Sequence, residues 1–179
     1  MKILRVRNCY GTLLNGEPCP RPALKGSNYC KDHQPKGETI IPRSTAASLL
    51  SIEGIGPSYA AKLRKAGVRS ATALLAKGAT PQGRKEIAEK TGIGESLILR
   101  WVNHADLFRI KGVGGQYAEL LEAAGVDTVV ELAQRNADNL HQTLVAANEE
   151  QKRVRKLPTL KESKAWVKQA KRLPRTIKY

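Results

Sequence analysis

The apolar residues of this chain recur at helical spacing along most of its length. Tyr59, Ala60 and Leu63 stand one, three and four positions apart, which places their side chains on one face of a helix. The same three residue types recur 58 positions later, and residues 95–102 and 160–170 show similar spacing. Only 4 % of the residues are aromatic, so the core must consist mainly of Ala, Leu, Ile and Val. The pattern predicts closely packed short helices.

The recurrence belongs to an internal repeat. Residues 52–79 align with residues 110–137 at a constant offset of 58, without a gap and with 11 identities in 28 positions. The identical pairs include three pairs of glycines, at Gly54/Gly112, Gly56/Gly114 and Gly67/Gly125. The chain therefore contains a duplication.

Each copy contains the sequence Gly-apolar-Gly directly before a predicted helix. In the first copy this is Gly54-Ile55-Gly56, followed by Pro57 at the expected first helical position. Glycines allow the chain to turn tightly and leave backbone N–H groups uncovered at the helix N-terminus. Such a terminus can hold a phosphate oxygen.

This pattern resembles the helix-hairpin-helix motif, whose family grips the backbone of DNA without reading its sequence. The tandem arrangement over about residues 47–174 resembles the DUF4332 family of helical domains. The resemblance includes Trp101-Val102 and Trp166-Val167, each followed three residues later by an alanine. It implies a mainly α fold, a duplicated helix-hairpin-helix bundle. At the N-terminus of this bundle we expect the small zinc-stabilised module described next.

The first 36 residues predict a metal site. Cys9, Cys19, Cys30 and His33 supply four ligands within 25 residues, the number that a structural tetrahedral Zn²⁺ site requires. Prolines and glycines surround them, so this segment has almost no core and its fold must come from the metal. The segment resembles a short Cys3His zinc-binding motif, and we expect one structural Zn²⁺. The alternative is three ordinary cysteines and an unrelated histidine.

The positive charge is concentrated at the two ends of the chain. The formal net charge is +15, with +5 in residues 1–43, zero in residues 44–150 and +10 in residues 151–179. A polyanion is therefore the leading class of partner. The alternative is a solvated basic helix that aids solubility. The expected organisation is a zinc module (1–36), a linker (37–46), the tandem helix-hairpin-helix domain (47–150), and a basic helix and tail that complete the second repeat (151–179).

The two glycine turns differ in the side chains that follow them. Hydroxyl and basic groups follow the first turn, whereas acids such as Glu119 and Glu122 follow the second and would repel a phosphate backbone. If only one turn binds nucleic acid, it is the first; a purely architectural role for both is the alternative. The candidate nucleic-acid-binding residues are Gly54, Ile55, Gly56, Ser58, Lys62, Lys65, Arg69, Gly112, Gly114, Gly115, Lys152, Arg153, Arg155, Lys156, Lys168, Lys171 and Arg172.

No catalytic motif accompanies these features. His104 and His141 are single histidines on helical stretches, which we interpret as surface residues, and no phosphate-loop, dinucleotide-binding or HExxH motif is present. We expect a non-enzymatic DNA- or RNA-binding protein with no small-molecule substrate. The alternative is an assembly subunit of a larger ribonucleoprotein or polymerase complex. Without an apolar stretch of about 18 residues or a signal peptide, we expect a cytoplasmic protein associated with the nucleoid or with a ribonucleoprotein.

Overall fold

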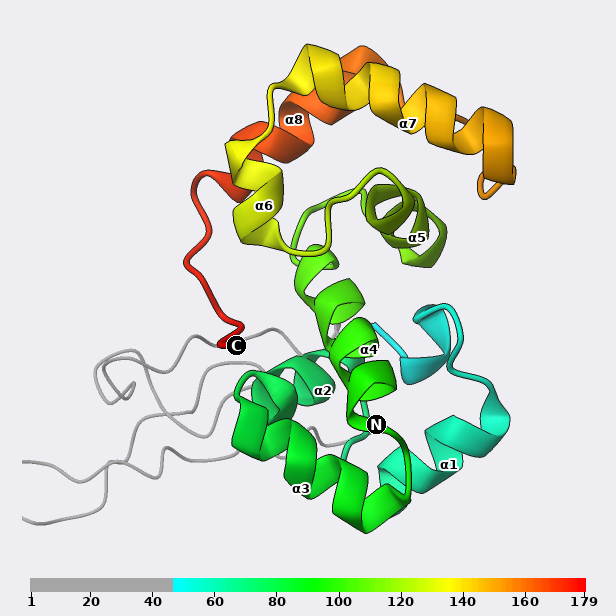
Figure 1. Ribbon diagram of the computed structural model, residues 1–179, viewed down its shortest axis with the longest axis vertical. Helices are drawn as coiled ribbons and strands as arrows, with labels where there is room; N and C mark the ends of the chain where they lie inside the picture. The colour runs from blue at the N-terminus through cyan, green and yellow to red at the C-terminus, as the bar shows by residue number, and fades with distance from the viewer. Residues whose placement is uncertain (1–46) are drawn as a thin grey trace, which may run out of the picture. The chain divides into compact units, whose positions relative to one another are not determined.

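The computed structural model describes residues 47–179, and these residues fold into helices joined by short connections (Figure 1). Within this described part there is no β-strand, and the prediction of a mainly α fold is confirmed. Nor does it contain a helix that is both long and apolar enough to cross a membrane. The elements are η1 (Leu49–Ser51), α1 (Pro57–Lys65), α2 (Ala71–Gly78), α3 (Pro81–Thr91), α4 (Glu95–Leu107), α5 (Gly115–Ala123), α6 (Val129–Gln134), α7 (Ala137–Gln151) and α8 (Leu160–Ala170).

Local capping signals fix where most helices begin. The N-caps of α2 and α6 are Ser70 and Thr128, whose side-chain oxygens accept hydrogen bonds from backbone N–H groups in these helices. The capping box of Thr159 and Glu162 at the start of α8 is also present. By contrast, α1, α4 and α5 begin after glycines and have no side-chain cap.

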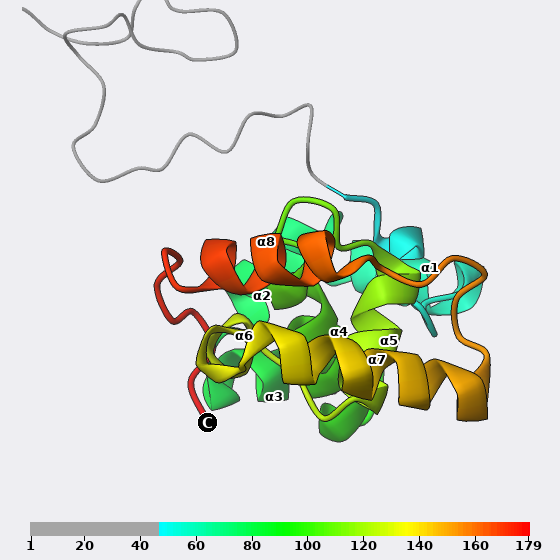
Figure 2. The same cartoon turned by 90° about the horizontal axis from the view of Figure 1, so that it is seen from above.

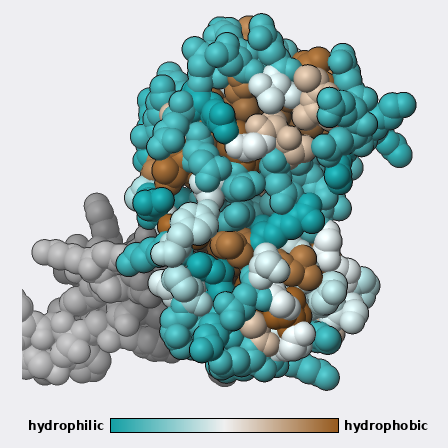
Figure 3. All heavy atoms as spheres, viewed as in Figure 1, coloured by the Kyte–Doolittle hydropathy of each residue, from teal (hydrophilic) through white to brown (hydrophobic). Residues whose placement is uncertain are grey.

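The buried apolar side chains form two clusters, one in each half of the described chain. Trp101 lies in the first cluster and Trp166 in the second, and both are almost fully buried. In each half a tyrosine ring from the helix after the glycine turn packs on the tryptophan: Tyr59 on Trp101, with ring centroids 5.1 Å apart, and Tyr117 on Trp166, with centroids 5.3 Å apart. On the face shown in Figure 3, apolar residues gather in an upper and a lower group, and hydrophilic residues cover most of the remaining surface.

The helices of the two halves correspond in order and packing. In the first half α4 packs against α2 and α3, and in the second half α8 packs against α6 and α7. Figure 2 shows α6, α7 and α8 lying together. The bounds of α1 and α5 differ by the sequence offset of 58, whereas Trp101 and Trp166 are 65 positions apart. The second half therefore has seven additional residues before its last helix. The segment directly before the last helix is residues 92–94 in the first half and residues 152–159 in the second.

The C-terminal tail, which the sequence assigns to the second repeat, is anchored to the first half of the chain. The side chain of Ile177 is 2 % exposed and belongs to the first apolar cluster. Beside it, the Lys178 N–H donates to the Ala79 carbonyl oxygen at 2.7 Å, and the guanidinium of buried Arg84 donates to the Lys178 carbonyl oxygen at 3.0 Å. The tail, drawn in red in Figure 1, thus connects α8 to the end of α2.

Candidate nucleic-acid interface

The first glycine turn is held in place by two buried isoleucines. Ile52 and Ile55 are 1 % and 4 % exposed, and the Ile55 N–H donates to the Ile52 carbonyl oxygen at 3.1 Å. The side chain of Ile55 therefore lies in the core, and only its backbone is available to a ligand. The turn leads into α1 through Gly56, the N-cap residue.

The two glycines of this turn have different structural roles. Gly54 has a φ of +84°, and a Cβ atom placed on it would lie 3.3 Å from the indole nitrogen of Trp101. Gly56 has an ordinary extended backbone, with φ −79° and ψ 177°, and a Cβ atom there would meet nothing within 4 Å. The fold therefore requires glycine at position 54, whereas glycine at position 56 leaves space in front of the N-terminus of α1.

Helix α1 presents donors and positive charge to solvent. The first N–H groups of a helix have no partner within the helix, and here no side chain caps them. The positive end of the helix dipole points to the same place, and the first turn of the helix contains no acidic residue. Ser58, Lys62 and Lys65 are all exposed. Arg69, in the connection to α2, is exposed as well.

The second turn has the same backbone geometry but different surroundings. Gly112 has a φ of +95° and lies against Trp166 as Gly54 lies against Trp101. A Cβ atom on Gly115, however, would collide with the Ser51 carbonyl oxygen and would lie 3.3 Å from the Glu53 carboxylate. The start of α5 thus packs against the Ser51 backbone and the Glu53 carboxylate, just before the first turn, which makes it less suitable for an anion than α1. Gly114, its N-cap residue, has no atom near its Cβ position.

The helices that follow the two turns differ most in exposure. Seven of the nine residues of α1 are exposed, but only one of the nine residues of α5 is. Lys62 corresponds to Leu120, which is fully buried, and Lys65 corresponds to half-buried Ala123. These differences between the two copies are visible in the sequence, but the burial of α5 is not.

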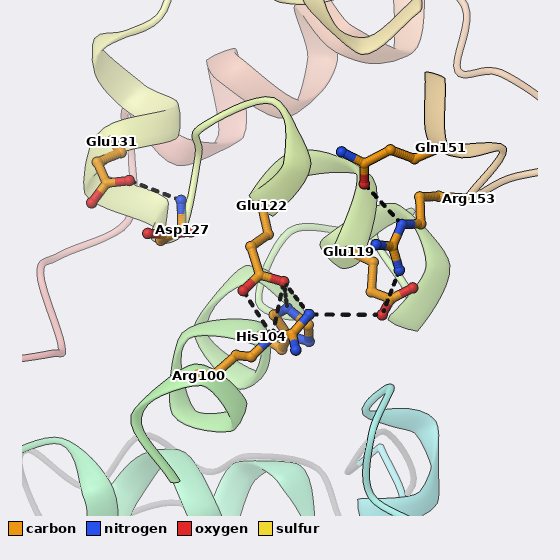
Figure 4. Close-up of polar contacts among 8 residues, drawn as sticks. All are labelled: Arg100, His104, Glu119, Glu122, Asp127, Glu131, Gln151 and Arg153. Carbon is orange, nitrogen blue, oxygen red and sulfur yellow. Dashed lines mark hydrogen bonds and ion pairs between the residues drawn. The ribbon is translucent and has the colours of Figure 1, made fainter. Parts of the chain in front are cut away.

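The acids that follow the second turn hold α5 to α4 (Figure 4). The Arg100 guanidinium donates to both carboxylate oxygens of Glu122, with two of the N–O distances at 2.8 Å, and His104 Nε2 lies 3.1 Å from the same carboxylate. His104 is 1 % exposed, so its interpretation as a surface residue is wrong. The Glu119 carboxylate lies 3.9 Å from the Arg100 guanidinium and 3.5 Å from the Arg153 guanidinium.

This network also changes the acidity of its members. Burial acts to raise the pKa of Glu122, but hydrogen bonds and positive charge from Arg100 and His104 outweigh it and hold the pKa below its usual value. Burial, reinforced by the negative charges of Glu131 and Glu122, raises the pKa of nearby Asp127. Glu122 therefore serves the contact between α4 and α5.

The basic residues of the C-terminal region lie on two segments. Lys152, Arg153, Arg155 and Lys156 are exposed on the segment between α7 and α8, where Arg153 also contacts Gln151 and Glu119. Exposed Lys168, Lys171 and Arg172 lie on α8 and directly after it. Lys168, Lys171 and Arg172 form the basic surface of α8, a helix that buries Trp166, Val167 and Ala170 in the core.

No catalytic pair is formed by His104 and Asp106. The two side chains have different partners: His104 lies against Glu122, whereas Asp106 accepts hydrogen bonds from Arg109 at 2.6 Å and from the Val129 N–H at 2.9 Å. Among residues 47–179 no three histidine, cysteine or acidic side chains gather into a metal site. The predicted zinc ligands Cys9, Cys19, Cys30 and His33 lie outside the described residues.

Comparisons with known proteins give one match. The model of a family described as "Domain of unknown function (DUF4332)" matches residues 53–173, which include both glycine turns and both buried tryptophans. No curated protein and no solved structure matches the chain.

Proposed function

This chain belongs to the DUF4332 family, whose function is unknown, and we propose that it is a non-catalytic protein that binds the phosphate backbone of nucleic acid largely without regard to sequence. In this proposal the main contact is the first glycine turn with α1. The turn and its counterpart at residues 112–114 are assigned as helix-hairpin-helix turns. The zinc module and the basic surface of α8 add further contacts.

One observation carries the proposal: α1 begins after a solvent-exposed glycine, Gly56, and no side chain caps the N-terminus of this helix. Gly56 has no steric need to be glycine, and the donors behind it face solvent. Ser58, Lys62 and Lys65 stand exposed on the same helix. Backbone donors, a hydroxyl group and lysines at a helix N-terminus are the groups that bind phosphate oxygens.

The proposal is tested by reversing charge on α1. Lys62→Glu combined with Lys65→Glu should weaken binding to random-sequence oligonucleotides at least tenfold and lower the slope of log affinity against log salt by about one unit for each lost phosphate contact. Lys85→Glu with Lys90→Glu is the matched control, because both lysines are exposed on α3 and the net charge changes equally. Equal effects of the two pairs, or no effect of the first, would contradict a specific role for α1.

The contribution of α8 to nucleic-acid binding must be tested by substitution rather than by truncation. Deleting residues 151–179 would remove Trp166 from one cluster and Ile177 from the other, so lost binding could reflect unfolding. Lys168→Glu with Lys171→Glu changes only exposed positions. We expect this pair to weaken binding and to leave the helical circular dichroism unchanged.

A further inference from the structure

The two halves of the described chain differ in what lies over the helix after each glycine turn. In the second half, segment 152–158, which follows α7, lies against α5. The Tyr117 hydroxyl donates to the Lys156 carbonyl oxygen at 3.1 Å, and the Arg153 guanidinium lies 3.5 Å from the Glu119 carboxylate. Val154 and Leu157 belong to the same apolar cluster as Leu120.

The path of this segment is fixed by one side chain of α7. The Asn148 amide oxygen accepts from the Val154 N–H at 2.8 Å, and its amide nitrogen donates to the Val154 carbonyl oxygen at 3.1 Å. Asn148 thus binds the segment as a neighbouring strand would. The second half thus covers the outer face of α5 with a segment of its own.

The first half has no such segment within the described residues. Its α3 and α4 are joined by residues 92–94 alone, and Ile93 of this connection is buried. Tyr59 packs on Trp101 as Tyr117 packs on Trp166, but its side chain is 36 % exposed, and within residues 47–179 its hydroxyl has no hydrogen-bond partner. The outer face of α1 is thus built like that of α5, but no segment within residues 47–179 covers it.

We propose that the outer face of α1 binds an extended single strand of nucleic acid in the place that corresponds to segment 152–158 on α5. This inference rests on the proposed function and specifies its substrate. Charge identifies the occupant: where α5 has Leu120 and Ala123, α1 has Lys62 and Lys65, so the occupant is anionic. Residues 1–43, with a net charge of +5, do not meet that requirement.

The exposed apolar side chains favour a single strand over a duplex. Leu50, 52 % exposed, lies on η1 just before the turn, and Tyr59 lies just after it. A duplex presents its phosphates outward and keeps its bases stacked inside, so it offers no partner to an exposed aromatic ring. Unpaired bases stack on aromatic side chains while lysines hold the phosphates. Lys62 and Lys65 therefore bind phosphates, and Tyr59 stacks against a base.

The experiment compares a labelled 15-nucleotide single strand of mixed sequence with its duplex, by fluorescence anisotropy at several salt concentrations. The single strand should bind more tightly. Tyr59→Leu should weaken single-strand binding about tenfold with little effect on the duplex, and Tyr59→Phe should retain most of the affinity because the ring remains. Tyr117→Leu is the matched control, because Tyr117 packs on the corresponding tryptophan, and it should leave the affinity for both probes unchanged.

The outcomes separate this inference from the proposed function. If Lys62→Glu with Lys65→Glu weakens both probes but Tyr59→Leu weakens neither, the single-strand assignment is wrong and backbone binding stands. If the lysine pair has no effect, both proposals fail. Should Tyr59→Leu lower the melting temperature by more than a few degrees, photo-crosslinking of the unaltered protein to an iodouracil-containing single strand decides. A crosslink at Tyr59 supports the inference, and its absence overturns it.

Discussion

The indole nitrogen of Trp101 lies 3.3 Å from the position that a Cβ atom on Gly54 would occupy. The same distance separates the indole nitrogen of Trp166 from the Cβ position of Gly112. Both glycines also have positive φ angles, of +84° and +95°. In each half, therefore, the turn and the tryptophan restrict each other, and the sequence Gly-apolar-Gly is part of the core packing as well as a turn.

Gly54→Ala should destabilise the fold while Gly56→Ala should not. A side chain at position 54 must adopt the left-handed conformation and crowd Trp101, which we expect to cost about 1–3 kcal/mol. At position 56 the backbone suits any residue and the space is open, so we expect a change within about 0.5 kcal/mol. Urea denaturation measures both. Equal stabilities of the two variants would contradict the different roles assigned to these glycines.

Glu122→Gln should weaken the contact between α4 and α5. The substitution removes the carboxylate that Arg100 and His104 share, at an expected cost of about 1–2 kcal/mol at pH 7. Asp138→Asn is the control, because it breaks the exposed ion pair with Lys164 and should cost less than about 0.5 kcal/mol.

The effect of Glu122→Gln should also depend on pH. The pKa of Glu122 is lower in the folded protein than in the unfolded chain, so its ionised form stabilises the fold above the usual glutamate range near 4.5. That contribution is lost as the pH falls through the folded-state pKa. The thermal unfolding temperatures of the unaltered protein and of Glu122→Gln should therefore converge as the pH is lowered from 6 to 3. A stability gap that stays constant over this range would contradict the assignment.

Ile177→Ala should destabilise the first half of the chain from a position near the C-terminus. The side chain is 2 % exposed in the first apolar cluster, and truncating it should cost about 2–4 kcal/mol. Tyr179→Ala, two residues further on and 65 % exposed, should have little effect. Hydrogen exchange at α2 and α3 gives the local readout. Unchanged exchange there in Ile177→Ala would show that the tail does not support these helices.

One tightly bound Zn²⁺ per chain is expected from the first 36 residues, because Cys9, Cys19, Cys30 and His33 have suitable spacing in a segment without a core of its own. Elemental analysis of extensively dialysed protein checks this, and less than stoichiometric metal would contradict it. Cys19→Ser should abolish the metal and leave the helical circular dichroism of residues 47–179 nearly unchanged.

Much of the fold and part of the site could be predicted from the sequence, because the signals are local. The caps at Ser70, Thr128 and Thr159 and the helix starts after Gly56 and Gly114 each depend on residues within one turn of one another. The repeat at offset 58 correctly placed α1 and α5 at equivalent positions. The lysines that distinguish the first turn from the second are also visible without a structure.

Burial and partners were decided only by the tertiary structure. Leu120 and Tyr117 lie in a cluster with Val154 and Leu157, more than 30 residues away in the sequence. This contact covers α5, whereas no such segment within residues 47–179 covers α1. His104, which we interpreted from the sequence as a surface residue, is buried, and so is Ile177, and both contact residues 18 or more positions away. Helical periodicity shows which residues share a face, but which face is covered depends on where distant segments pack. The amino-acid sequence thus determined the repeated unit, and the packing of residues 152–158 on α5 determined that, within residues 47–179, α1 is the more exposed of the two equivalent helices.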